Sequence, residues 1–262
     1  MFMGQRRQQP HPDYDDPIIS ESQGVRYLHF NSEWIQGAMR VSRPEKLEFE
    51  YTQQMMSWLL FLAPPADREI GILGLGAGSL TRFCQHHFDS DIVTVEWNPQ
   101  VTALCESAFA LRLNNACRVE HQDAHDWVLD PHNENRCSVL MVDLYDYTAQ
   151  GPVCSSAEFY RGCRRVCRDL GVVTINLFGH HSSFRRNLRH IRQAFDDRVL
   201  LFPETEDGNR IVLAFAGPTL NVEQTALVER AKRVQSLYRL PATGWLRTLL
   251  KENGKNGPTI VI

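Results

Sequence analysis

Two acidic residues at the end of an apolar run are the first candidates for chemistry. The run Ser138–Leu144 reads SVLMVDL, and Asp146 follows Asp143 at a spacing of three. The carboxyl end of a buried parallel strand is where open α/β sheets place their sites. Two carboxylates there could attract a cationic substrate, and one could take a proton from an attacking amine. Tyr145 and Tyr147 could form the walls of a slot for an aliphatic chain. The alternative for Asp143 and Asp146 is that each simply caps a turn.

A second candidate is the glycine-rich stretch Ile70–Leu80, which reads IGILGLGAGSL. Glycines at Gly74, Gly76 and Gly78 allow positive φ and a close approach to a ligand, and the following helix turns free N–H groups toward it. Strand, tight turn and helix in this order are typical of a nucleotide-like ligand site. A phosphate-binding loop needs a Lys after the glycines, and none follows here. We therefore expect an adenosine compound whose phosphates need not be held.

Two more polar positions follow the next predicted strands. Glu96 stands 22 residues after Gly74 at a strand end, where a carboxylate can accept both ribose hydroxyls. Asp123 follows the next strand, where it could accept from the adenine amine while the small Ala124 leaves room for the ring. The alternatives are an exposed strand-end acid for Glu96 and a helix N-cap for Asp123.

Strands that alternate with helices must position these residues. The predicted parallel strands are Glu69–Leu75, Ile92–Glu96, a short strand from Val119, Ser138–Leu144 and Gly171–Phe178. The predicted helices are Leu80–His87, Pro99–Leu111, Asp126–Leu129, Ser155–Arg168 and Ser182–Phe195. Val199–Phe202 and Arg210–Phe215 are predicted to close the sheet as an antiparallel pair around a turn. The pattern predicts an α/β fold with a doubly wound, mostly parallel, seven-stranded sheet.

The chain divides into four predicted regions. Residues 1–20 are polar and aperiodic, which predicts a disordered tail. Residues 21–65 are predicted to form a small β-hairpin and an amphipathic helix that ends before Pro64-Pro65. Residues 66–218 are predicted to form the doubly wound α/β domain, which carries the candidate ligand-binding and catalytic residues. Residues 219–262 are predicted to form a helical tail, which we interpret as solvated or dimer-facing surface.

Composition limits the possible partners and the compartment. The 28 basic and 31 acidic residues give a net charge of −3 with no long basic run, so nucleic acid is not an expected partner. The longest apolar run falls short of the roughly 18 residues of a membrane span, and no signal peptide is recognisable. Seven cysteines, an odd number, favour a reducing compartment. Cys163 and Cys167 lack a second ligand pair, so we expect structural thiols, no metal site and a soluble cytoplasmic protein.

In this order, the four segments resemble the spermidine synthase (polyamine aminopropyltransferase) family, over about residues 26–215. GLGAGSL resembles the donor loop of that family, TVEWNP its ribose-binding acid, QDAHDW its adenine-side segment and DLYD its Asp-x-x-Asp site. The resemblance implies the Rossmann-like fold of class I S-adenosylmethionine-dependent methyltransferases. Gly74, Gly76, Gly78, Glu96, Asp123 and Ala124 would then bind the donor.

The same resemblance implies roles for the remaining site residues. Asp143 would be the catalytic base, and Asp146 would bind the substrate amine. The segment EFEYTQQMM resembles a helix of the family and would place Tyr51 at the site mouth. Tyr145 would contact the substrate, and the segment at Gly151-Pro152 resembles a lid loop that excludes water.

The implied reaction is aminopropyl transfer from decarboxylated S-adenosylmethionine to a di- or polyamine, with release of methylthioadenosine. The donor is a co-substrate, so we expect no tightly bound cofactor, and the family implies a homodimer. The chain departs from the family at Ala77, where the donor loop usually has an Asp for the propylamine, and at Tyr27-Leu28, where the family has Tyr-Gln. These changes spare the adenosine contacts and remove amine contacts.

Two alternative functions remain open at this point. The first is a small-molecule methyltransferase that uses S-adenosylmethionine. Such enzymes commonly have an acid two residues before the first loop glycine, where this chain has Ile72. The second is a non-catalytic adenosine-binding or dimer-partner protein. The presence of both Asp143 and Asp146 argues against it, because a purely structural protein has no evident need for two neighbouring acids.

Overall fold

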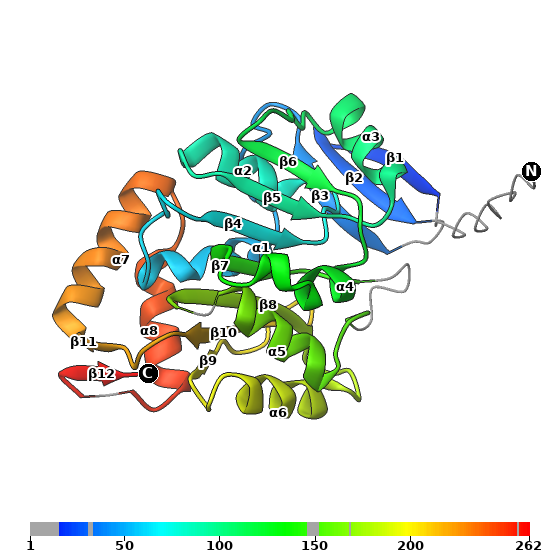
Figure 1. Cartoon of the computed structure of the whole chain (residues 1–262). Helices are drawn as coiled ribbons and strands as arrows, with labels where there is room; N and C mark the ends of the chain where they lie inside the picture. Colours follow the sequence, from blue (N-terminus) through cyan, green and yellow to red (C-terminus); the bar gives the residue numbers. More distant parts are fainter. Residues whose placement is uncertain (1–15, 31–33, 146–151, 168, 256) are drawn as a thin grey trace, which may run out of the picture.

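A twisted seven-stranded sheet forms the centre of the computed structural model, which describes residues 16–30, 34–145, 152–167, 169–255 and 257–262 (Figure 1). Its strands are β4 (Glu69–Leu73), β5 (Ile92–Val95), β6 (Cys117–Glu120), β7 (Cys137–Val142), β8 (Gly171–Phe178), β9 (Val199–Leu201) and β10 (Asn209–Ala216). They lie in the order β6-β5-β4-β7-β8-β10-β9. Strand β10 runs antiparallel to both neighbours, and β4 to β8 are parallel. The predicted α/β fold with a mostly parallel seven-stranded sheet is confirmed.

Helices cover both faces of this sheet because its strands are apolar on both sides. One face carries η1 (Met56–Leu60), α2 (Ser79–His87), α7 (Gln224–Tyr238) and α8 (Ala242–Glu252). The other carries α4 (Ala124–Leu129), α5 (Ala157–Val166) and α6 (Phe184–Ala194). Alternate residues of β4 divide between them, since Ile70 and Ile72 face the first core and Leu73 the second. None of the helices in the described part of the chain is long and apolar enough to cross a membrane.

A small antiparallel sheet precedes the main sheet and lies against its glycine-rich loop. It consists of β1 (Pro17–Ser22), β2 (Val25–Phe30) and β3 (Ile35–Arg40). A Cβ at Gly37 of β3 would lie 2.6 Å from the Cβ of Ala77, so the two backbones touch. Strand β1 lies largely within the range assigned to a tail from the sequence. It forms because all six of its residues pair with β2, although its side chains are mostly exposed and show no apolar alternation.

The segment between the two sheets is less regular than its periodicity indicates. A continuous amphipathic helix was expected there, but α1 covers Glu50–Met55 and tightens directly into the 3-10 turn η1. All five residues of η1 are buried, so packing against the sheet determines its geometry. The helix α3 (Pro99–Ala108) begins at Pro99 as expected, with Asn98 as its cap, and η2 (Pro131–Asn133) is a single short turn.

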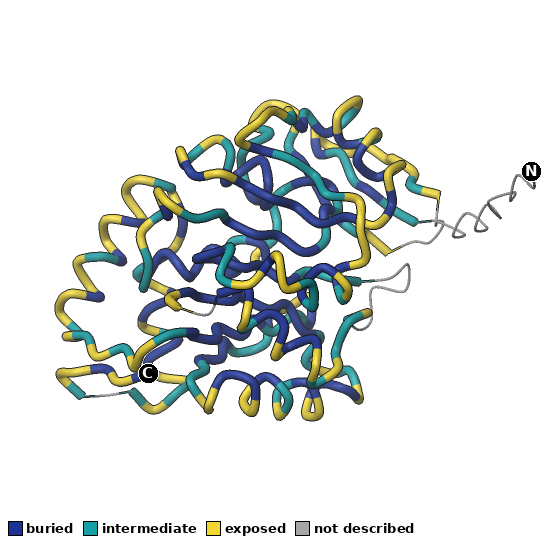
Figure 2. The backbone as a smooth tube through the Cα atoms, in the orientation of Figure 1, coloured by how far each residue is buried: buried dark blue, intermediate teal, exposed yellow. Residues whose placement is uncertain are grey.

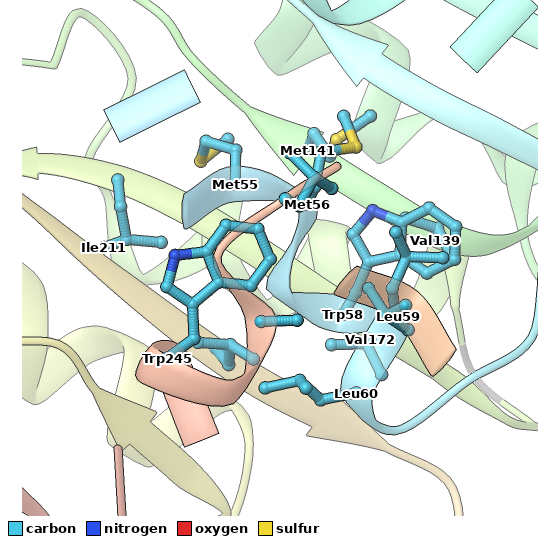
Figure 3. Close-up of a cluster of buried hydrophobic side chains, with 14 of the residues drawn as sticks. Met55, Met56, Trp58, Leu59, Leu60, Val139, Met141, Val172, Ile211 and Trp245 are labelled. Atoms are coloured by element: carbon cyan, nitrogen blue, oxygen red, sulfur yellow. The ribbon is translucent and has the colours of Figure 1, made fainter. Parts of the chain in front are cut away.

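The C-terminal region is part of the main core. Helices α7 and α8 pack against η1, and β11 (Asn221–Glu223) pairs with β12 (Thr259–Val261). Figure 2 shows the inner side of both helices as buried, and Figure 3 shows Trp245 of α8 beside Met55 and Leu60. The Arg230 guanidinium donates to the Leu59 carbonyl at 2.6 Å. Our interpretation of this region as a merely solvated or dimer-facing tail is therefore wrong for its inner faces.

A core substitution tests this integration of the C-terminal helices. Trp245 is 5% exposed, so Trp245→Ala should lower the free energy of unfolding by about 3 to 5 kcal/mol. Leu237 of α7 is 56% exposed, so Leu237→Ala is the matched control and should change the free energy of unfolding by less than about 0.5 kcal/mol. Chemical denaturation measures both, and equal effects would show that α8 does not support the core.

Candidate active site

A cavity of about 740 Å3 lies at the carboxyl edge of the main sheet. This edge includes the boundary between β4 and β7, where the order of successive strands changes direction: β5 and β6 lie on one side of it, and β8 to β10 lie on the other. Of the residues predicted to form the site, the cavity wall includes Tyr51, Gly74, Gly76, Glu96, Asp123, Ala124, Asp143 and Tyr145. Gly78 is absent from the described wall and instead precedes α2 as its N-cap residue. Asp146, Tyr147 and Gly151 lie outside the described residues.

The glycine loop brings two parts of the site together. Gly74, Gly76 and Gly78 all have positive φ, at 92°, 51° and 71°, as the sequence predicts. A Cβ at Gly74 would collide with the carbonyl oxygen of Asp143. Glycine at this position therefore allows the loop after β4 to touch the end of β7.

Glu96 is held at the end of β5 by backbone groups of the two adjacent loops. The Leu75 N–H donates to its Oε2 at 3.0 Å, and the Asn98 N–H donates to its Oε1 at 2.9 Å. Burial raises the pKa of this carboxyl, and these backbone hydrogen bonds oppose the shift. The Trp97 backbone also bonds to this carboxylate, so Glu96 is held in a fixed position in the cavity wall beside the glycine loop.

Asp123 has the capping function that we considered as its alternative. It is the N-cap of α4, and its Oδ1 accepts from the N–H groups of His125 at 2.7 Å and Asp126 at 3.4 Å. Both hydrogen bonds use the same oxygen, and the residue also lines the cavity together with Ala124. Capping and ligand contact are therefore compatible at this position.

Asp143 is half-buried within a network of polar side chains. The Asn176 amide donates to its Oδ1 at 2.9 Å, and the Tyr51 hydroxyl donates to the same carboxylate. Burial raises the pKa of Asp143 to about 6, and the two donors oppose the rise. The carboxyl can therefore exchange a proton near neutral pH.

Several members of this network were missed from the sequence. Asn176 lies on β8, where its amide oxygen accepts from the Asn209 amide at 3.1 Å and its carbonyl accepts from the Tyr145 hydroxyl at 3.1 Å. A polar residue in the apolar run GVVTINLF was the available signal for Asn176. Asn209 follows a turn and carried no such signal. Tyr51, expected at the site mouth, is half-buried in the cavity wall, and its hydroxyl bonds to Asp143.

The charged groups of the cavity wall all have one sign. Four carboxylates line it, from Glu96, Asp123, Asp143 and Asp207, and none of the described wall residues is Lys, Arg or His. Aromatic rings form much of the remaining wall: Phe30, Trp34, Phe49, Trp97 and Phe178. A cavity of this kind attracts cations and disfavours ligands that carry a carboxylate.

The strand order and the glycine-rich turn define a methyltransferase-like fold, and solved structures agree. Human methyltransferase-like protein 13, solved with SAH, is 21% identical with a TM-score of 0.64, over 73% of this chain and 93% of that chain. A probable spermidine synthase from Corynebacterium glutamicum is 17% identical with a TM-score of 0.67, over 92% and 91%. A spermidine synthase solved with a transition-state analogue is 17% identical with a TM-score of 0.62, over 90% and 87%. At these identities the likeness shows the fold.

Sequence relatives indicate a more specific class of protein than the fold does. The polyamine aminopropyltransferase of Neisseria meningitidis is 28% identical over 242 residues, which are 91% of this chain and 90% of the relative. The polyamine aminopropyltransferase of Chromobacterium violaceum is 27% identical over 246 residues, which are 93% of each. No family model matches the chain. The resemblance predicted from the motifs is confirmed, because the chain is a homologue of polyamine aminopropyltransferases along nearly its whole length.

The fixed carboxylate of Glu96 yields a binding prediction. We expect Glu96→Gln to weaken the binding of methylthioadenosine by roughly tenfold or more, because a charged acceptor for the ribose is lost. Isothermal titration calorimetry measures the dissociation constant. Glu106→Gln, at an exposed α3 acid outside the described cavity wall, is the control and should leave it unchanged. Equal affinity of the two variants would contradict the assignment of Glu96.

Proposed function

We propose that the protein transfers an aminopropyl group from decarboxylated S-adenosylmethionine to a di- or polyamine and releases methylthioadenosine. The observation that carries this proposal is the cavity wall with four carboxylates and no basic side chain among its described residues. Both proposed substrates are cations without a carboxylate. The relatives named polyamine aminopropyltransferase support the same activity.

The donor would lie along the glycine loop. The backbone of Gly74 and Gly76 would approach it closely, while Gly78 would begin the helix behind the loop. Glu96 would accept both ribose hydroxyls, and Asp123 with Ala124 would contact the adenine. The sulfonium would then face Asp143, since Gly74 and Asp143 are in direct contact.

Asp143 would act as the general base. The neutral acceptor amine attacks the carbon next to the sulfonium, the carbon–sulfur bond breaks, and its electron pair stays on sulfur. The new secondary ammonium passes its extra proton to the Asp143 carboxylate. Tyr51 and Asn176 would hold that carboxylate in place through their hydrogen bonds.

The acceptor would lie against the other predicted substrate residues. Asp146 and Tyr145 would contact it, and Tyr51 would contact both the acceptor and the base. The hydroxyl of Tyr145 is fixed by the Asn176 carbonyl, so its ring offers a defined wall for an aliphatic chain.

We further propose a cytoplasmic homodimer. All seven cysteines are free, which suits a reducing compartment. Strand β1 forms an edge of the N-terminal sheet and exposes Ile18 and Ile19, which offers a second copy both unpaired backbone groups and apolar side chains. Sedimentation equilibrium of the purified protein should give twice the mass of 30.1 kDa, and a monomer would contradict the dimer.

Product analysis tests the activity. Incubation with decarboxylated S-adenosylmethionine and a panel of diamines should give methylthioadenosine. Asp143→Asn should lower the rate by roughly 100-fold or more, because the base is lost. Asp91→Asn, at an exposed acid before β5, is the control and should keep full activity. S-adenosylhomocysteine from the ordinary donor would indicate a methyltransferase, and nucleoside binding without either product would indicate a non-catalytic protein.

The pKa of the base predicts a pH profile. Because the pKa of Asp143 is raised to about 6, the carboxylate is lost as the pH falls through this value. The rate at low acceptor concentration should then fall by about tenfold per pH unit below 6, in addition to the effect of amine protonation. Steady-state rates from pH 5 to 9 measure this. A residual activity of Asp143→Asn that retains the same break near pH 6 would contradict the role of Asp143.

A further inference from the structure

The turn between β9 and β10 holds an acid at the cavity that the reaction described above does not use. Asp207 lines the cavity, although its side chain is otherwise exposed. The Thr205 N–H donates to the Asn209 carbonyl at 2.8 Å, and the Gly208 N–H donates to the Thr205 carbonyl at 3.0 Å. The Gly179 N–H also donates to the Gly208 carbonyl at 2.8 Å. The turn is thus fixed both internally and to the end of β8.

This turn is connected to the proposed base. The Asn209 amide donates to Asn176, and the Asn176 amide donates to Asp143. The Tyr51 hydroxyl, which donates to Asp143, is also close enough to Asp207 for the charge of that residue to help raise the pKa of Tyr51. Asp143 and Asp207 therefore both act on Tyr51 in the same cavity.

The chemistry of a diamine requires two different environments. The attacking amine must be neutral and must pass a proton to its base. The second amine of the same molecule keeps its proton at neutral pH and needs a negative partner. Asp143 cannot serve both amines, because its carboxylate receives the proton that is released, and Asp146, proposed above to contact the acceptor, follows it by only three residues. Among the described residues, no Lys or Arg forms an ion pair with Asp207, so this carboxylate is available to a ligand cation.

We propose that Asp207 binds the distal ammonium of the acceptor and thereby selects diamines and polyamines over monoamines. This inference rests on the proposed aminopropyl transfer. The attacking amine lies at Asp143, the aliphatic chain lies along Tyr51, and the charged end lies at the β9–β10 turn. Asp207 is a specificity residue and takes no part in bond making.

Kinetics with two matched acceptors test the subsite. We compare 1,4-diaminobutane with butylamine, as acceptor or competitive inhibitor, at saturating decarboxylated S-adenosylmethionine. Asp207→Asn should raise the KM for 1,4-diaminobutane by about tenfold, because a charge-assisted contact is lost. The kcat, the KM for the donor and the constant for butylamine should stay the same. Glu206→Gln, at the neighbouring exposed acid outside the described cavity wall, should change none of these values.

Each outcome decides the proposal. Equal changes for both amines, or a raised KM for the donor alone, would overturn the assignment of Asp207 to the acceptor. If the unmodified protein forms no methylthioadenosine with any amine, the proposed function fails. The subsite is then tested separately, by calorimetric measurement of 1,4-diaminobutane binding to protein saturated with methylthioadenosine. Weaker binding of 1,4-diaminobutane to Asp207→Asn than to Glu206→Gln would then support the subsite, and equal binding would overturn it.

Discussion

The contact between Gly74 and Asp143 is the constraint on which the site depends. The Gly74 backbone touches the Asp143 carbonyl so closely that any side chain at position 74 would collide with it. Two backbone hydrogen bonds fix the same point, from the Gly74 N–H to the Val95 carbonyl and from the Asp143 N–H to the Leu73 carbonyl, both at 2.9 Å. The ends of β4, β5 and β7 therefore meet, and the glycine loop lies in the same cavity wall as the Asp143 carboxylate.

Burial and hydrogen bonding act against each other at this carboxylate. A buried charge without partners is strongly disfavoured, and the resulting rise in pKa would leave the acid protonated. Asn176 and Tyr51 supply donors that favour the charged form, so the pKa of Asp143 rises only to about 6. Asn176 is itself oriented by Asn209. The carboxyl of Asp143, the proposed base, is thus ionised at neutral pH and can still take up a proton.

The parts of the site that follow local rules could be predicted from the sequence. Glycines at positions 74, 76 and 78 predicted positive φ, and an acid at Glu96 was recognisable because strand ends of a parallel sheet share one edge. Asn176 and Asp207 could not be placed in the same way. Their relation to Asp143 depends on how β8 and the β9–β10 turn pack in three dimensions. The burial of the inner faces of α7 and α8 was missed for the same reason. The periodicity of a helix shows that it has an apolar face, but it does not show which element packs against that face.

The charge of the cavity makes the choice of donor the most direct test of the account. Four carboxylates without a basic partner among the described wall residues should accept the decarboxylated donor and repel the α-carboxylate of S-adenosylmethionine. Calorimetric titration of the unmodified protein with each donor measures this preference. The account predicts that decarboxylated S-adenosylmethionine binds at least about tenfold more tightly, a difference of roughly 1.4 kcal/mol. Equal affinity, or tighter binding of S-adenosylmethionine, would contradict it.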